Sequence, residues 1–207
     1  MPNFRDNARF QDDVVIKEDL TVLGDVQIDG TLSGGSMVGS AETAENGDGA
    51  VGTGGFCNTY RYTADNGDII TEIHVDLTGL DSSGTANDVI GNKTPGTDAA
   101  YIGRNVVATN GIVYKVEMSC LEVPLTGDAD VILVQGSAAD ESFDDTVANT
   151  ATVCDGTGDW ALGETISYTS GLTANYYLYL TQGGSDDATY TAGQFLIRLY
   201  GHAALTS

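Results

Sequence analysis

Apolar and polar side chains alternate with a period of two through most of the chain from residue 56 to about residue 201. Ile73 and Val75, for example, alternate with Glu72 and His74. This period is typical of β-strands with one buried face, and Asp-, Asn- and Gly-rich turns separate the segments. The candidate strands are 56–63, 69–77, 88–91, 100–103, 112–123, 130–135, 165–170, 175–182 and 194–201. We therefore predict an all-β fold, an antiparallel jelly-roll-like β-sandwich over residues 56–207.

In several of these strands the face opposite the predicted core is also apolar or aromatic. The residues concerned are Leu121, Tyr177, Tyr179, Leu196 and Tyr200. A strand that is apolar on both faces suggests a contact between subunits, and tyrosine suits such a contact because it joins a large apolar ring to a polar tip.

A second pattern, with a step of six residues, occupies the segment 14–33, where short apolar pairs are followed by Gly and Asp. A segment of roughly 19 residues buries too little apolar area to offset the entropy of ordering it. Three chains around a threefold axis could pool these side chains in one core. We therefore predict a trimeric β stalk, with a hairpin packed on its own domain as the alternative. Its interface would be formed by Val14, Ile16, Leu20, Val22, Val26, Ile28 and Leu32.

Two further segments have the composition of connecting chain. Residues 1–13 precede the repeat and are interpreted as an extended N-terminal arm. Residues 34–55 are rich in Gly, Ala, Ser and Glu and contain almost no large apolar side chain, so we predict a linker.

Charge is distributed unevenly along the chain. Thirty acidic and eight basic residues give a formal net charge of −22. The first 17 residues hold three of each sign, with Arg5, Arg9 and Lys17 as the bases, so 27 acids and five bases follow. Such a surface repels phosphates, and we predict no nucleic-acid partner. The acidity favours solubility, and it also fits a particle exterior or a high-salt setting.

Cysteine usage argues against a disulfide-framework protein, and hydropathy argues against a membrane-spanning one. Cys57, Cys120 and Cys154 are odd in number and form no CxxC motif, so no disulfide framework is indicated. No apolar run approaches the length of a membrane span, and the first residues do not resemble a signal peptide. We expect synthesis in a cytoplasm and no membrane partner.

Candidate chemistry is sparse. His74 and His202 lie on or beside polar strand faces, and no hydrolase or metalloprotease motif accompanies them. Acidic pairs such as Asp155 with Asp159, and the motif at residues 66–68 (Asn-Gly-Asp), are interpreted first as turns, because none continues into the twelve-residue calcium-ligand pattern. A calcium site is the alternative. We predict no enzyme activity, no metal and no cofactor.

The order and spacing of several short segments resemble virion structural proteins of tailed bacteriophages, notably marine and cyanobacterial ones. The resemblance covers roughly residues 60–201, and the N-terminal repeat resembles stalks of phage appendages. The segments are 86–91 (ANDVIG), 100–103 (AYIG), 110–114 (NGIVY), 118–122 (MSCLE), 177–180 (YLYL) and 188–197 (ATYTAGQFLI).

The resemblance implies a homotrimeric capsid decoration, or cement, protein on the outside of the phage head. Proteins of this kind grip the major capsid protein with an N-terminal arm and project a jelly roll outward. The arm residues expected to bind the capsid are Phe4, Arg5, Arg9 and Phe10.

Two other hypotheses stay open at this point. In the first, the jelly roll is a receptor- or glycan-binding module of a head or tail fibre, with Trp160 and Tyr101 as exposed aromatics in its outer loops. In the second, it is a depolymerase with a carboxylate pair in a groove, which the sequence supports little.

Overall fold

A computed structural model describes residues 46–156 and 158–203 of the chain. The chain divides into two compact units, Met1–Ala41 and Glu42–Ser207, and all described residues belong to the second. The predicted arm (1–13), the repeat (14–33) and the first part of the predicted linker (34–45) lie outside the described residues.

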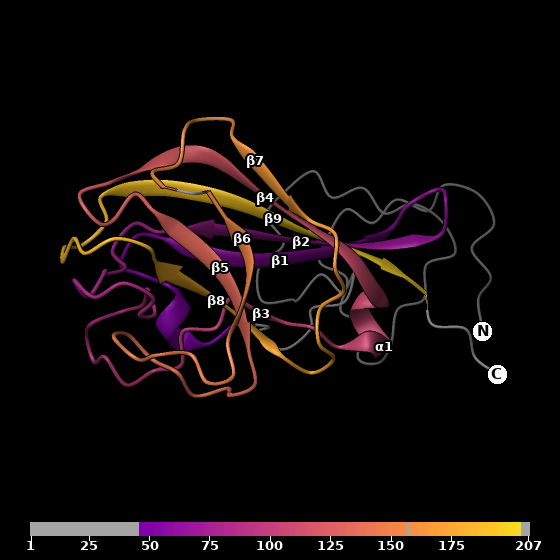
Figure 1. Ribbon diagram of the computed structural model, residues 1–207, viewed down its shortest axis with the longest axis horizontal. Helices are drawn as coiled ribbons and strands as arrows, with labels where there is room; N and C mark the ends of the chain where they lie inside the picture. Colours follow the sequence, from indigo (N-terminus) through magenta and orange to yellow (C-terminus); the bar gives the residue numbers. More distant parts are fainter. Residues whose placement is uncertain (1–45, 157, 204–207) are drawn as a thin grey trace, which may run out of the picture. The chain divides into compact units, whose positions relative to one another are not determined.

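Nine strands of the described part form two antiparallel sheets that face each other (Figure 1). Two short helical turns accompany them, the 3-10 turn η1 (Asp48–Ala50) and the four-residue helix α1 (Val107–Asn110). The larger sheet has the order β1 (Phe56–Thr63), β2 (Asp68–Asp76), β9 (Ala192–His202), β4 (Ile112–Leu125) and β7 (Thr165–Tyr168). The smaller has the order β3 (Gly103–Arg104), β8 (Tyr177–Gln182), β5 (Val131–Gly136) and β6 (Ala151–Asp155).

The strand pairs are nested along the chain. Strand β2 pairs with β9, β3 with β8, β4 with β7 and β5 with β6, all antiparallel. A long hairpin rolled up in this way, with alternate pairs in opposite sheets, is a jelly roll. The predicted all-β jelly-roll sandwich is confirmed, and β1 extends the larger sheet beyond β2.

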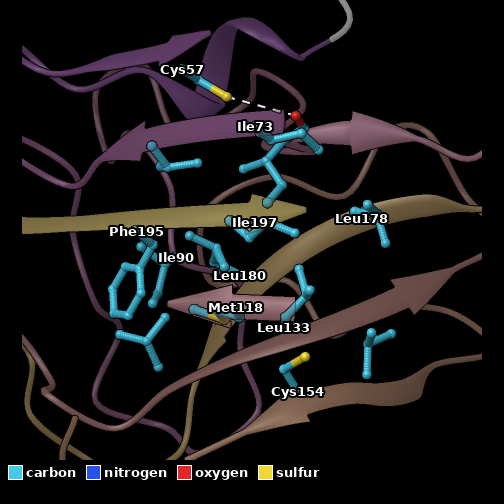
Figure 2. Close-up of a cluster of buried hydrophobic side chains, with 14 of the residues drawn as sticks. Cys57, Ile73, Ile90, Met118, Leu133, Cys154, Leu178, Leu180, Phe195 and Ile197 are labelled. Carbon is cyan, nitrogen blue, oxygen red and sulfur yellow. Dashed lines mark hydrogen bonds between the residues drawn. The ribbon is translucent and has the colours of Figure 1, made fainter. Parts of the chain in front are cut away.

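The core lies between the sheets, where the inward side chains of both meet. Ile73 of β2, Ile197 of β9 and Met118 of β4 share one register position and are at most 1% exposed. Figure 2 shows this cluster, with Leu133 and Leu178 of the smaller sheet among its members. The period-two pattern of the sequence therefore marks the inward face of these strands correctly.

A second apolar cluster covers the outer face of the smaller sheet. Tyr179, expected from the sequence to mark a subunit contact, is fully buried there, and its hydroxyl donates to the carbonyl of Ala138 at 2.8 Å. Its neighbours include residues from the connections after β2 and β5. The members are Val89, Ala100, Ile132, Val134, Val147 and Tyr179. The outward apolar residues of β5 and β8 are thus explained within one chain.

The last ten residues of the predicted linker, 46–55, pack against the jelly roll. The amides of Gly47 and Gly49 donate to the carbonyls of Tyr101 (2.8 Å) and Ala99 (2.9 Å), and Ala50 is 1% exposed. A Cβ on Gly47 would lie 1.9 Å from the Ala99 oxygen. Glycine here permits close backbone packing, so this part of the predicted linker is attached to the jelly roll.

Two local elements differ from the sequence interpretation. Strand β6 was not predicted, and residues 88–91 form isolated bridges, such as Val89 with Thr181, in place of a named strand. In the described part of the chain, none of the helices has the length and apolar character needed to cross a membrane.

Leu133 and Leu162 form a matched pair for testing the core. Leu133 is 0% exposed between the sheets and Leu162 is 71% exposed. We expect Leu133→Ala to lower the free energy of unfolding by about 2–5 kcal/mol, because it leaves a cavity. Leu162→Ala should change it by less than about 0.5 kcal/mol. Urea unfolding of both variants measures this, and equal effects would contradict the assigned core.

Candidate functional site

The site residues predicted from the sequence lie outside the described part of the chain. This holds for the arm residues Phe4, Arg5, Arg9 and Phe10. It also holds for the interface residues Val14, Ile16, Leu20, Val22, Val26, Ile28 and Leu32. Their roles therefore stay predictions, and the surface of the jelly roll is the place to look for a site among the described residues.

The outward face of the larger sheet, formed by β1, β2, β9 and β4, is the most distinctive surface of the described part. Strand β1 presents three large rings there, Phe56, Tyr60 and Tyr62, which are 36%, 56% and 50% exposed. Among the described residues β1 has a strand neighbour on one side only, so it is an edge strand. Exposed rings along a sheet edge are typical of surfaces that contact another protein.

A cross-strand row places one of these rings beside a buried apolar group, and a second ring meets a histidine. Tyr62 pairs with Ile70 of β2, which in turn pairs with Tyr200 of β9. Ile70 is buried although it faces outward, because its neighbours on the sheet shield it. One step along, the Tyr60 ring meets the His74 ring edge-on, with centroids 5.7 Å apart. The outer face is thus more apolar than an ordinary solvated sheet face.

The charges on this face are paired with one another. Arg198 of β9 donates to Glu72 of β2 at 2.7 Å. Glu117 of β4 accepts from Lys115 at 2.8 Å and from the hydroxyl of Tyr200. The Lys115 hydrogen bond, followed by that of Tyr200, lowers the pKa of Glu117. Burial and then the Glu117 bond raise the pKa of Tyr200 to about 12. A partner covering this face would therefore leave few charges unpaired.

A histidine–carboxylate pair lies at the end of the same face. Asp68 accepts from Tyr114 (2.8 Å), from Asn66 (2.8 Å) and from Nδ1 of His202 (2.7 Å). The Tyr114 and His202 rings stack, with centroids 4.3 Å apart. The Tyr114 hydrogen bond is the main cause that lowers the pKa of Asp68. The cluster joins the start of β2 to the start of β4 and the end of β9.

The three cysteine side chains are buried. Burial raises the pKa of Cys57 and of Cys154 to about 12 each, and it also raises that of Cys120. Thiols in such surroundings are poor nucleophiles, because the thiolate is the reactive form. Within residues 46–156 and 158–203, no three His, Cys, Asp or Glu side chains are grouped to hold a metal ion.

The aromatic residues expected for glycan binding are placed differently from the prediction. Trp160 is 2% exposed; its indole donates to the Val131 carbonyl at 2.6 Å, and its ring meets Phe195 edge-on at 5.3 Å. Tyr101 is half-buried against Tyr177 and Tyr179. The prediction that Trp160 is an exposed loop aromatic is wrong, because the indole completes the core.

In the described part of the chain, the exposed Phe and Tyr rings are those of β1, and the alternation of residues 56–62 was the signal that could have identified them. Because β1 is an edge strand, its outward side chains have neighbours from the same sheet on one side only. The sequence pattern gives the alternation but leaves open which strand is an edge.

Comparisons with known protein families, curated proteins and solved structures found no match. The fold and surface define the class, an all-β jelly-roll protein with one aromatic sheet face. Any narrower function is therefore argued from the chain itself.

The Asp68 cluster gives a pH-dependent prediction. Because the folded-state pKa of Asp68 is lowered, its contribution to stability is present above the unfolded value of about 3.9 and is lost as pH falls through the folded value. Tyr114→Phe removes the main cause, so the pKa of Asp68 should rise and the acid-unfolding midpoint should move to higher pH. Carboxyl NMR titration measures the first effect and circular dichroism the second.

Tyr62→Phe is the control for that variant. Tyr62 lies on the same face, is 50% exposed and donates to no carboxylate among residues 46–156 and 158–203. An Asp68 pKa that responds equally to both variants would contradict the assigned role of Tyr114.

Proposed function

We propose that this chain is a structural component of a phage virion, a homotrimeric decoration protein on the exterior of the head. The proposal rests on the resemblance inferred from short sequence segments between about residues 60 and 201, and the jelly roll is a fold that viral capsid proteins use widely. In this proposal the protein has no catalytic role; it stabilises the head by bridging neighbouring capsid subunits.

The observation that carries the proposal is that the jelly roll fills its own core. The inward positions of both sheets are occupied by side chains of residues 46–203, including Trp160, Phe195 and Leu133 at 2% exposure or less. In this proposal the seven predicted interface side chains of the repeat at 14–33 find their partner outside that core. The same repeat in two further chains is the simplest partner, and this supports a trimer.

The arm is the proposed contact with the major capsid protein. Phe4 and Phe10 would supply apolar anchors, and Arg5 and Arg9 would supply positive charge in a chain that is otherwise strongly acidic. Phenylalanine and arginine are suited to such contacts, because one buries a large area and the other forms several hydrogen bonds.

One observation favours the second candidate, a receptor- or glycan-binding fibre module. Tyr60 and Tyr62 are exposed on β1, and exposed rings can stack on sugars as well as pack on proteins. Adsorption of the purified protein to host cells, lost in a Tyr60→Ser/Tyr62→Ser variant, would favour that function over decoration.

The repeat can be tested in the full chain with a matched pair of substitutions. Val22→Asp places a charge at a predicted interface position, whereas Gln27→Asp places the same charge between two such positions. We expect light scattering after size-exclusion chromatography to give a trimer for the unchanged chain and for Gln27→Asp. Val22→Asp should give monomers, because three charges would be buried together.

A truncated chain beginning at Glu42 retains the whole compact unit and should be monomeric. A monomeric full chain, or a trimer that survives both Val22→Asp and truncation, would contradict the trimeric stalk.

The arm is tested separately by deleting residues 1–13. We expect the shortened protein to remain trimeric and to lose binding to undecorated phage heads, because the proposed capsid contacts are removed. Co-sedimentation with heads measures occupancy, and Arg5→Ala/Arg9→Ala should reduce it. Full occupancy by the shortened protein would show that another segment binds the capsid.

A further inference from the structure

Four connections meet at one end of the sandwich, and together they are strongly acidic. The register places the ends of β2, β4, β6 and β8 together there; Leu125 pairs with Ala192, Val131 with Gln182, and Ile132 with Asp155. The β4–β5 and β8–β9 connections are seen at the left of Figure 1.

The connections 77–102, 126–130, 156–164 and 183–191 carry nine acidic residues, three in the first and two in each of the others. Their single base, Lys93, pairs with Asp187 at 3.4 Å.

Two of these carboxylates contain oxygen atoms that are buried without a partner. Asp128 is 3% exposed; its Oδ1 accepts the amide of Asp130 at 2.9 Å, and its Oδ2 has no hydrogen-bond partner. Oδ1 of Asp130 is likewise buried and unpartnered. It is strongly unfavourable to remove a carboxylate oxygen from water without a donor or a cation to replace the lost contacts. The buried, unpartnered Oδ2 of Asp128 therefore indicates a place for a ligand.

The two residues opposite these carboxylates are Gly183 and Gly184, which have no side chain. A Cβ on Gly183 would lie 2.3 Å from Oδ2 of Asp130, and one on Gly184 would lie 2.5 Å from Oδ2 of Asp128. Only glycine therefore leaves room for both carboxylates against this part of the chain. The Gly-Gly pair thus keeps the two acids close to the same stretch of backbone.

The electrostatic surroundings of Asp130 have one sign. Burial is the main cause that raises the pKa of Asp130, and repulsion from the charges of Asp155, Asp128 and Asp159 raises it further. Repulsion of this kind is relieved by a bound proton or by a bound cation. Carboxylate oxygens in a hydrated loop are the ligands that Ca²⁺ prefers.

We propose that Asp128 and Asp130 form a binding site for a hydrated divalent cation, with Ca²⁺ as the ion that fits best. The two carboxylates supply the direct protein ligands, and water completes the coordination shell. Mg²⁺ would fit less well, because it requires a nearly ideal octahedron of ligands. The cation would join the β4–β5 and β8–β9 connections and so stabilise this end of the sandwich.

Trp160 offers a selective probe of this site. Its amide donates to the Ala129 carbonyl at 3.2 Å and its indole donates to the Val131 carbonyl, so it contacts the residues on both sides of Asp130. It is also the only tryptophan of the chain. Terbium(III), a hard cation that replaces Ca²⁺ at oxygen sites, should therefore luminesce when the indole is excited in the full-length protein.

We expect saturable terbium luminescence that CaCl₂ displaces and KCl of equal ionic strength does not. Asp130→Asn should weaken terbium and Ca²⁺ binding on the order of tenfold or more, because it removes one ligand charge. Asp128→Asn should do the same. The control is Asp65→Asn, which makes the same charge change at an exposed turn at the other end of the sandwich and should leave binding unchanged.

Thermal unfolding gives a second readout that does not depend on luminescence. CaCl₂ should raise the Tm of the unchanged protein and of Asp65→Asn above the value in matched KCl, since an ion that binds the folded state stabilises it. Asp130→Asn should lose this shift, and without Ca²⁺ it should unfold no lower than the unchanged protein, because it relieves repulsion.

Two results would overturn the site. If Ca²⁺ raises the Tm of all variants equally, the ion acts by screening the −22 net charge. If neither luminescence nor Tm responds to Ca²⁺, Mn²⁺ or terbium, water alone satisfies the buried oxygens.

Discussion

The fold depends on the pairing of β9 with two strands at once. Strand β9 lies between β2 and β4, and its inward residues Phe195, Ile197 and Leu199 are at most 1% exposed. A shift of one residue in either pairing would turn these side chains outward and bring Arg198 into the core. The register that buries them also brings the two ends of the jelly-roll hairpin together, so closure of the sandwich and burial of its core are one event.

The sequence predicted those features that depend on local alternation. Strand β1 coincides with the predicted segment 56–63, and the inward positions of β2, β4 and β9 follow the period of two. The sequence pattern did not predict the nested strand order, because pairing between distant segments has little effect on the local pattern.

The mistakes share a physical cause, which is coverage by segments distant in sequence. Tyr179 was expected to face a partner, and connections of its own chain cover it. Trp160 was expected in an exposed loop, and that loop folds into the core. Residues 46–55 were assigned to a linker from their composition, and their glycines permit tight packing against the jelly roll. Composition describes what a segment can do, while its burial depends on what lies opposite.

The distribution of charge limits where copies of this protein can meet. The acidic end has nine acids against Lys93, so two such ends would repel each other unless cations intervene. On the outer face of the larger sheet, by contrast, Glu72 and Glu117 already have basic partners, and the exposed rings of Tyr60 and Tyr62 lie beside them. Contacts between chains are therefore opposed least by charge repulsion at this face or through the near-neutral residues 1–17. A trimer formed through the repeat at 14–33, as proposed, does not itself require contacts of the aromatic face, and the acidic end is best placed in solvent.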